Sequence, residues 1–258
     1  MRYFFHIGYN GTYYHGWQRH SNVVTVQEVL EDRLKKVLKL PIGIIGCGRT
    51  DAGVHASQYF FHADIGPKWE YDLAFRLNKT LPAGIALFDI IAMDGLQHAR
   101  FDATQRTYDY FLHTYKDPFL NNLSAMYLLK NLRVDEMRKA VALLSRYKDY
   151  AAFCTSPAKY VHTLCYVSAA ELFINDKGDK LRFRISANRF LSRMIRIIVA
   201  RLLKVGKGEL SVDEFESYFL DTQKPIDVVP AHPQGLYLSK IVYPYLDLPP
   251  RTEFLLWC

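Results

Sequence analysis

The chain contains few cysteines and no run of apolar residues long enough to cross a membrane. Its four cysteines are scattered over more than 200 of the 258 residues, and no two form a CxxC pair. No zinc or disulfide framework is therefore visible. The apolar start is too short for a signal peptide and is interrupted by His6 and Gly8. We expect a soluble, cytoplasmic protein.

The sequence also lacks a P-loop, a dinucleotide-binding fingerprint and any low-complexity linker. Half of the residues are hydrophobic and 14% are aromatic, which is typical of a globular protein. Lysine and arginine number 33 against 26 acidic residues, which gives a net charge of +7. This charge favours a polyanionic partner such as nucleic acid and carries no information about the fold.

Hydrophobic periodicity divides the chain into alternating strands and helices. In the first part we expect strands over residues 2–9, 42–45, 57–64 and 85–93, and helices over residues 25–40 and 69–80. In the second part we expect strands over residues 105–115, 164–174, 181–186 and 235–243, and helices over residues 134–147, 189–205 and 211–220. Thr25 and Glu28 have the spacing of a capping box. This order indicates an α+β fold in two halves, with a cleft between them as the natural site.

Residues 46–56 read GCGRTDAGVHA, a glycine-rich loop that follows a short apolar strand. Glycines allow a backbone to approach a ligand closely, and polar residues on such loops often belong to sites. The competing interpretation is a polar turn that uses Asp51 as a cap. Asp51, His55, His62 and Asp64 fit no standard metal spacing. Cys47 is a candidate nucleophile but is more typical of a small buried side chain.

Two further patterns are typical of RNA binding. The loop at residues 10–20, NGTYYHGWQRH, mixes aromatic, basic and amide side chains with glycines, which suits base stacking and phosphate contacts. Its aromatic residues could instead turn inward. Arg189, Arg193 and Arg196 follow an i, i+4, i+7 spacing on the predicted long helix. They form either a solvated face or a partly buried stripe that needs carboxylate or phosphate partners.

Seven segments together resemble the TruA family of tRNA pseudouridine synthases. They are YNGTYYHGWQRH, TVQEVLEDRL, GCGRTDAGVHA, LNKTLP, HARFDATQRTYDYFLHT, FLSRMIRIIVA and GLYL, in the order that the family shows. The resemblance extends from about residue 3 to residue 244, and GRTDAGVHA is its most specific part. It implies two similar α/β-sandwich halves, ferredoxin- or RRM-like, with mainly antiparallel sheets. These halves, residues 1–104 and 105–258, would flank a central basic cleft.

The resemblance also implies an activity and its catalytic residues. Asp51 would be the nucleophile that isomerises uridine to pseudouridine in the anticodon stem-loop of tRNA, at positions 38, 39 and 40. Arg196 would be the guanidinium partner that favours the ionised carboxylate. Tyr108 would pack against the target base and take part in proton transfer, and Arg49 would enter the space that the flipped nucleotide leaves. Substrate binding would fall to Tyr14, Trp17, Gln18, Arg19, His55, Arg100, Arg106, Arg189 and Arg193.

The resemblance further implies a homodimer that binds tRNA and needs neither a cofactor nor a metal. Three positions depart from the family pattern: Asn10 replaces an aspartate, His162 an arginine and Ala200 a glycine. A paralogue with a shifted RNA target therefore stays open. Two competing hypotheses are a tRNA-binding or chaperone module without catalysis, and a metal-dependent hydrolase that uses Asp51 and His55.

Overall fold

The computed structural model describes residues 1–66, 69–221 and 227–251, and the chain forms two compact units. Among the described residues, the first unit consists of 1–104 and 237–251, and the second unit of 105–236. The sequence assigned everything after residue 104 to one half. Residues 237–251 instead pack with the first unit, where the buried Gln58 side chain accepts a hydrogen bond from the Ile241 N–H at 2.9 Å.

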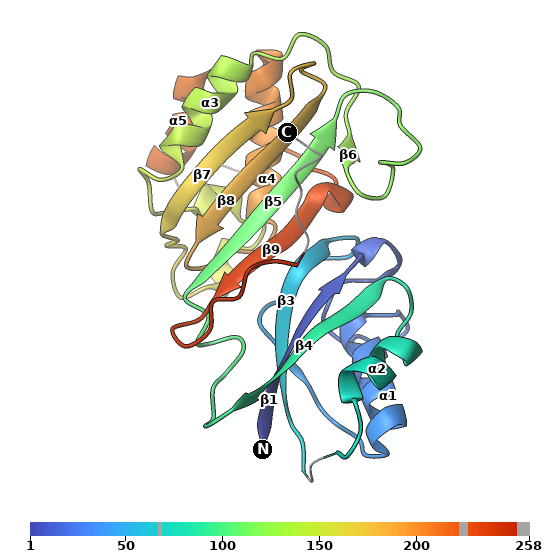
Figure 1. The fold of residues 1–258 in the computed structure, drawn as a ribbon. Helices are drawn as coiled ribbons and strands as arrows, with labels where there is room; N and C mark the ends of the chain where they lie inside the picture. The colour runs from blue at the N-terminus through green and yellow to red at the C-terminus, as the bar shows by residue number, and fades with distance from the viewer. Residues whose placement is uncertain (67–68, 222–226, 252–258) are drawn as a thin grey trace. The chain divides into compact units, whose positions relative to one another are not determined.

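The first unit is built on a sheet of four main strands in the order β4-β1-β3-β9 (Figure 1). They are β1 (Arg2–Tyr9), β3 (His55–Asp64), β4 (Ile85–Met93) and β9 (Leu236–Val242). β1 runs antiparallel to both β3 and β4, whereas β9 runs parallel to β3. A short strand, β2 (Ile45–Gly46), pairs with β3. The predicted strand at 42–45 is therefore almost absent, and Ile45 is 47% exposed rather than buried.

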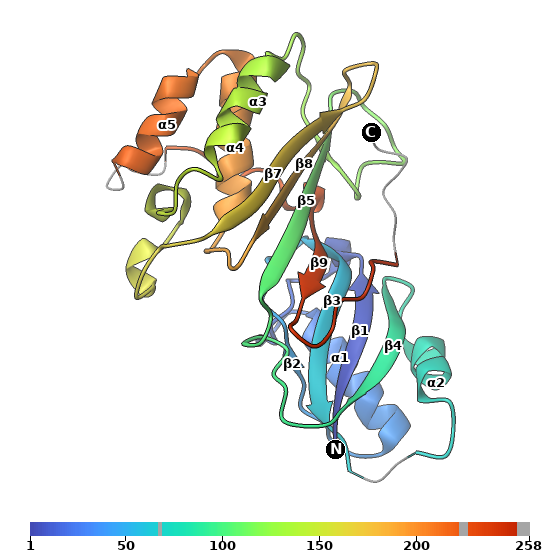
Figure 2. The same ribbon diagram turned by 60° about the vertical axis from the view of Figure 1, so that its left-hand side comes forward.

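Two helices, α1 (Val26–Leu38) and α2 (Leu73–Thr80), lie on one face of this sheet (Figure 2). Leu30, Leu34 and Leu77 from the helices are buried there. Phe5 and Phe61 stack on that face with ring centroids 4.7 Å apart. The apolar period of 3.6 residues in α1 and the alternation of the strands thus bury one shared core, as the sequence indicated.

The first turn of α1 forms only half of the predicted capping box. The Thr25 hydroxyl accepts a hydrogen bond from the Glu28 N–H at 3.4 Å. The Glu28 carboxylate lies 3.5 Å from the Arg19 guanidinium, in place of the return bond that the box needs. A complete capping box joins Ser211 and Glu214 at the start of α5 (Val212–Leu220).

The second unit is built on the antiparallel strands β5 (Gln105–His113), β8 (Lys180–Ala187) and β7 (Val167–Ile174), in that order. A short strand, β6 (Ala125–Met126), runs parallel to β5. Three helices lie on one face of this sheet: α3 (Val134–Leu143), α4 (Met194–Lys207) and α5 (Figures 1 and 2). In the described part of the chain, no helix is both long and apolar enough to cross a membrane.

The predicted long helix begins five residues later than expected. Arg193 has φ +58°, in the left-handed region, and α4 starts after it at Met194. A left-handed residue cannot continue a right-handed helix. Arg189, Arg193 and Arg196 therefore do not form a stripe on one helical face, and that prediction was wrong.

His62 is buried in the first unit with its charge suppressed. Its ring is 2% exposed, and its Nδ1 accepts a hydrogen bond from the Ala99 N–H at 3.1 Å. Burial, together with the positive charges of Arg2 and His98, lowers the pKa of His62 to about 4. The neutral ring is therefore part of the folded structure at physiological pH.

We expect His62 to make the free energy of unfolding rise with pH between about 4 and 6.5. The pKa of the folded residue is about 4 and that of an unfolded histidine is 6.5, so the unfolded state binds more protons in this window. Lowering the pH from about 7.5 to about 5 should cost about 2 kcal/mol through this residue. Urea unfolding of the wild type and of His62→Asn at both pH values measures the difference. Asparagine keeps an acceptor for Ala99, and an unchanged pH dependence in this variant would contradict the assignment.

Candidate functional site

Asp51 lies on the loop between β2 and β3, and its side chain is exposed. The residue before it is anchored twice. The Thr50 hydroxyl is hydrogen-bonded to the Tyr9 hydroxyl at 2.8 Å, and the Thr50 carbonyl accepts from the Trp17 N–H at 3.2 Å. After Asp51, the Gly53 N–H donates to the Tyr14 carbonyl at 3.2 Å. The loop is thus fixed on both sides of the carboxylate.

The three glycines nearest Asp51 serve different purposes. A Cβ on Gly46 would lie 2.1 Å from the Tyr59 hydroxyl oxygen and 2.5 Å from the Trp17 ring, so packing requires glycine there. Gly53 has φ +76°, a backbone conformation that favours glycine. A Cβ on Gly48 would meet nothing within 4 Å. Gly48 therefore leaves open space in front of the backbone, as close approach of a ligand requires.

The loop at residues 10–20 is packed against the Asp51 loop. A Cβ on Gly16, which has φ +82°, would lie 2.3 Å from the Thr50 carbonyl oxygen. Trp17 is 2% exposed and stacks on Tyr59 with ring centroids 4.1 Å apart. Tyr14 is 8% exposed. Both predicted RNA-stacking residues thus lie inside the first unit, where they support the loops, whereas Tyr13 is exposed.

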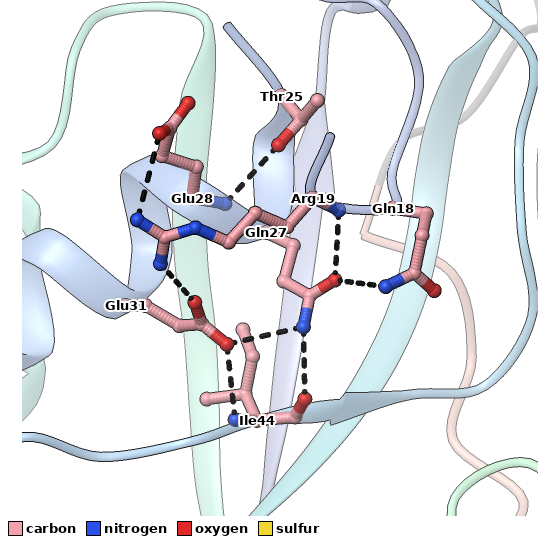
Figure 3. Close-up of polar contacts among 7 residues, drawn as sticks. All are labelled: Gln18, Arg19, Thr25, Gln27, Glu28, Glu31 and Ile44. Carbon is pink, nitrogen blue, oxygen red and sulfur yellow. Dashed lines mark hydrogen bonds and ion pairs between the residues drawn. The ribbon is translucent and has the colours of Figure 1, made fainter. Parts of the chain in front are cut away.

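A polar network connects these loops to α1, and Figure 3 shows the part that involves Gln18 and Arg19. The Arg49 Nε donates to the Gln18 Oε1 at 3.2 Å, and the Gln18 amide donates to the Gln27 Oε1 at 3.0 Å. Gln27 in turn donates to Glu31 at 3.0 Å, and Glu31 holds the Arg19 guanidinium at 2.7 Å. Sequence reasoning missed Gln27 and Glu31, although their i, i+4 spacing on a predicted helix was a usable signal.

His55 is a structural residue of this loop. Its ring is 1% exposed, stacks on Tyr237 with centroids 4.4 Å apart, and accepts the Gly11 N–H at Nδ1, 3.0 Å away. Asp64, another candidate metal ligand, forms an ion pair with Arg2 at 2.8 Å. The contacts of His55 are thus those of a buried residue that supports the fold.

In the second unit, three predicted site residues lie at or beside residues 188–190. The Arg106 guanidinium donates to the Asn188 carbonyl at 3.1 Å, and the Arg189 N–H donates to its side chain at 2.9 Å. Tyr108 is half-buried and meets the ring of Phe190 edge-on, with centroids 5.1 Å apart. β5 and the loop after β8 therefore present an aromatic and basic group together.

Arg196 lies in the first turn of α4 and is braced by the chain near Ala231. Its Nε donates to the Ala231 carbonyl at 2.6 Å, and the Ala231 N–H donates to the Arg196 carbonyl at 2.9 Å. Beside it, burial raises the pKa of Tyr110, whose hydroxyl stays protonated and donates to the His232 carbonyl at 2.9 Å. Arg193, which precedes the helix, is exposed.

Arg201 is a buried arginine of α4, whereas the sequence analysis considered partial burial only for Arg189, Arg193 and Arg196. It is 0% exposed, and its guanidinium carbon lies 3.4 Å from the centre of the Tyr218 ring. It also donates to Asp227 at 3.3 Å. Only four positions separate Asp227 from Ala231, so this pair anchors the chain that braces Arg196. The signal missed was an arginine between the apolar runs 197–200 and 202–203.

The predicted residues thus belong to both units. The first unit carries Tyr14, Trp17, Gln18, Arg19, Arg49, Asp51, His55 and Arg100, and the second carries Tyr108, Arg106, Arg189, Arg193 and Arg196. In the first unit, the two interlocked loops bring together all of these residues except Arg100. Arg100 lies on a separate exposed turn.

Comparison with known proteins identifies the family. The sequence profile of a family described as tRNA pseudouridine synthase matches residues 140–244. A tRNA pseudouridine synthase A from Porphyromonas gingivalis is 38% identical over 248 residues, which cover 94% of this chain and 97% of that protein. The chain belongs to the tRNA pseudouridine synthase A family. A tRNA pseudouridine synthase A from Parabacteroides distasonis is 39% identical, over 94% of this chain and 96% of that protein.

This member of the tRNA pseudouridine synthase A family keeps its first loop in shape despite Asn10. The Asn10 Oδ1 accepts hydrogen bonds from the Thr12 N–H at 3.0 Å and from the Thr12 hydroxyl at 2.6 Å. An aspartate accepts the same two bonds, so the substitution preserves the cap. His162 is exposed, and no contact in the structure explains it.

We expect Gly46→Ala to lower the free energy of unfolding by about 1 to 3 kcal/mol, because its methyl group would overlap Tyr59 and Trp17. Gly48→Ala is the matched control in the same loop and should change stability by less than about 0.5 kcal/mol. Urea unfolding of the two variants makes the comparison. Equal losses would show that the loop is less tightly packed than these contacts indicate.

Proposed function

We propose that this protein isomerises uridine to pseudouridine in the anticodon stem-loop of tRNA, at positions 38, 39 and 40, with Asp51 as the nucleophile. Membership of the family shows the reaction class, tRNA pseudouridine synthesis. The observation that carries the residue assignment is the exposed Asp51 carboxylate on a loop fixed on both sides by Thr50 and Gly53. A nucleophile needs that combination of access and fixed position.

The chemistry explains why a carboxylate suits this loop. The reaction breaks the bond between uridine N1 and ribose C1′, turns the base, and joins C5 to C1′. N1 gains a proton and C5 loses one, so no outside oxidant or reductant takes part. Asp51 would hold either C1′ or the base C6 while the base turns. It would be displaced from C1′ as C5 attacks, or would leave C6 after the bond between C5 and C1′ has formed. The proposal therefore includes no cofactor and no metal.

Arg196 and Tyr108 would complete the site from the second unit. We propose that the Arg196 guanidinium pairs with the Asp51 carboxylate and that Tyr108 packs against the target base and takes part in removing the C5 proton. Arg196 is suited to this because Ala231 holds its Nε at 2.6 Å and fixes the direction of the guanidinium. Tyr108 is suited because its ring is half-buried beside Phe190.

Arg49 would fill the space that the flipped nucleotide leaves. The target uridine lies in or beside a stem, so it has to leave the stack before a carboxylate can reach it. Arg49 is exposed two residues before Asp51, and Gln18 orients it through a bond of 3.2 Å. Gln18, Arg19, Arg100, Arg106, Arg189 and Arg193 would contact the RNA. For Tyr14, Trp17 and His55 we propose an indirect role, because all three are buried.

The proposed assembly is a cytoplasmic homodimer in which two similar α/β-sandwich halves flank a basic cleft. The net charge of +7 supports a polyanionic substrate, and phosphate contacts make its binding salt-dependent. The departure from the family pattern at His162 leaves open the alternative of a paralogue with a shifted RNA target. Mapping pseudouridines in tRNA from cells that lack the protein distinguishes the two.

We expect Asp51→Asn to abolish tritium release from tRNA that carries C5-tritiated uridine. Loss of the nucleophile should slow the reaction at least about a thousandfold, while tRNA binding stays within a few-fold of the wild type. The assay includes a chelator, so that a metal-dependent hydrolase is excluded in the same experiment. Asp94→Asn, an exposed residue of the first unit, is the control and should react normally. Undiminished release by Asp51→Asn would overturn the assignment.

We expect Arg49→Ala to lower kcat by about tenfold or more with little change in the Kd for tRNA. Filling the vacated space stabilises only the complex in which the nucleotide is flipped, so the loss falls on turnover. Single-turnover kinetics and filter binding at one salt concentration measure the two quantities. Equal losses in Kd and kcat/KM with unchanged kcat would instead assign Arg49 to plain phosphate binding.

A further inference from the structure

The first unit carries an exposed aromatic ring that its packing does not explain. Phe101 is 74% exposed, and it lies on the segment that follows β4. Single exposed apolar residues are common and by themselves indicate nothing. The backbone beneath Phe101 is, however, held by several side chains, which gives the turn a fixed position.

One histidine and one aspartate close the turn that carries Phe101. The His98 N–H donates to the Asp102 carboxylate at 2.7 Å, and the Asp102 N–H donates to the His98 carbonyl at 3.1 Å. The His98 Nδ1 accepts the N–H groups of Arg100 at 3.1 Å and Phe101 at 3.2 Å. These four bonds within five residues leave the turn little freedom.

The sheet holds the same turn from below. The His62 ring of β3 accepts the Ala99 N–H at 3.1 Å, and the Tyr243 hydroxyl donates to the Ala99 carbonyl at 2.7 Å. The Arg2 guanidinium donates to the carbonyls of Leu96 at 2.9 Å and Gln97 at 3.0 Å. Side chains from β1, from β3 and from the segment after β9 thus fix the turn that carries the exposed Phe101 ring.

The orientation of the ring is fixed as well. His98 stacks on Phe101 with centroids 4.3 Å apart and planes 30° apart. The guanidinium carbon of Arg100 lies 5.7 Å from the centre of the Phe101 ring. A rigid aromatic ring beside an arginine pairs a stacking surface with a phosphate-binding group, which is how proteins bind unpaired nucleotides. Because the ring is already ordered, binding loses little conformational entropy.

We propose that Phe101 is a stacking platform for an unpaired base of the tRNA substrate, with Arg100 on a neighbouring phosphate. The proposal rests on the proposed function, because it takes RNA as the substrate. β3 rises about 3.3 Å per residue, so His62 lies about 23 Å along the strand from His55, which follows the Asp51 loop. The platform is therefore remote from Asp51, and it binds substrate and transition state equally.

The test uses the full-length protein and a full-length tRNA transcript. Phe101→Ala should raise the Kd for tRNA roughly 5- to 100-fold and KM by a similar factor, with kcat within about twofold, because a stacking contact away from the reaction is lost. Phe101→Trp should bind tRNA as the wild type does, whereas Phe101→Leu should bind as weakly as Phe101→Ala. The slope of log Kd against log salt should stay unchanged in Phe101→Ala and fall by about one unit in Arg100→Ala.

Phe75→Ala is the matched control. Phe75 is 59% exposed in the same unit, and the Lys79 ammonium lies 5.1 Å from the centre of its ring, so it also pairs an exposed ring with a cation. Equal binding by Phe101→Ala and the wild type, equal losses in Phe101→Ala and Phe75→Ala, or full rescue by leucine would each overturn the proposal. Failure of the wild type to release tritium would reject the proposed function instead, and the wild-type arm separates the two failures.

Discussion

The site of the first unit depends on the packing of Trp17 between two loops. Its indole ring stacks on Tyr59, and its backbone N–H holds the carbonyl of Thr50, the residue before Asp51. Gly16 and Gly46 exist as glycines because the same packing leaves no room for a Cβ. An exposed carboxylate on a glycine-rich loop would otherwise sample many positions. Packing of the buried Trp17 fixes the loop that carries Asp51. Because Trp17 is buried, its ring is not available for stacking on RNA.

In the second unit, buried charges support the proposed site residues. Asp109 in the middle of β5 is 0% exposed and forms ion pairs with Arg182 at 2.7 Å and Arg184 at 2.9 Å on β8. A buried carboxylate is tolerated only with such partners. Because side chains alternate along a strand, fixing Asp109 on one face directs Tyr108 and Tyr110 to the other. Near Arg196, the buried Arg201 pairs with the exposed Asp227, so ion pairs support both Tyr108 and Arg196.

Several parts of this architecture were predictable from local sequence. The strand at residues 2–9, the helix from Val26 to Leu38 and the hairpin of β7 and β8 follow periods of 2 and 3.6 residues, and the structure confirms them. The start of α4 was not predictable, because nothing in the sequence around Arg193 marks a left-handed residue. The directions of Tyr14 and Trp17 were also undecided, since an aromatic loop residue has the same local sequence whether it faces RNA or the core.

The sequence by itself determined the family, the reaction class and the identity of the candidate nucleophile, because those depend on residue types in a specific order. Tertiary structure alone decided which of the candidate residues are accessible. It buried His55, Tyr14 and Trp17, joined Arg49 to α1 through Gln18, and brought residues 237–251 to the first unit. It also left the ring of Phe101 exposed on a turn that side chains from other strands hold in place. Each of these outcomes depends on contacts between residues far apart in the chain, and periodicity and spacing report only on near neighbours.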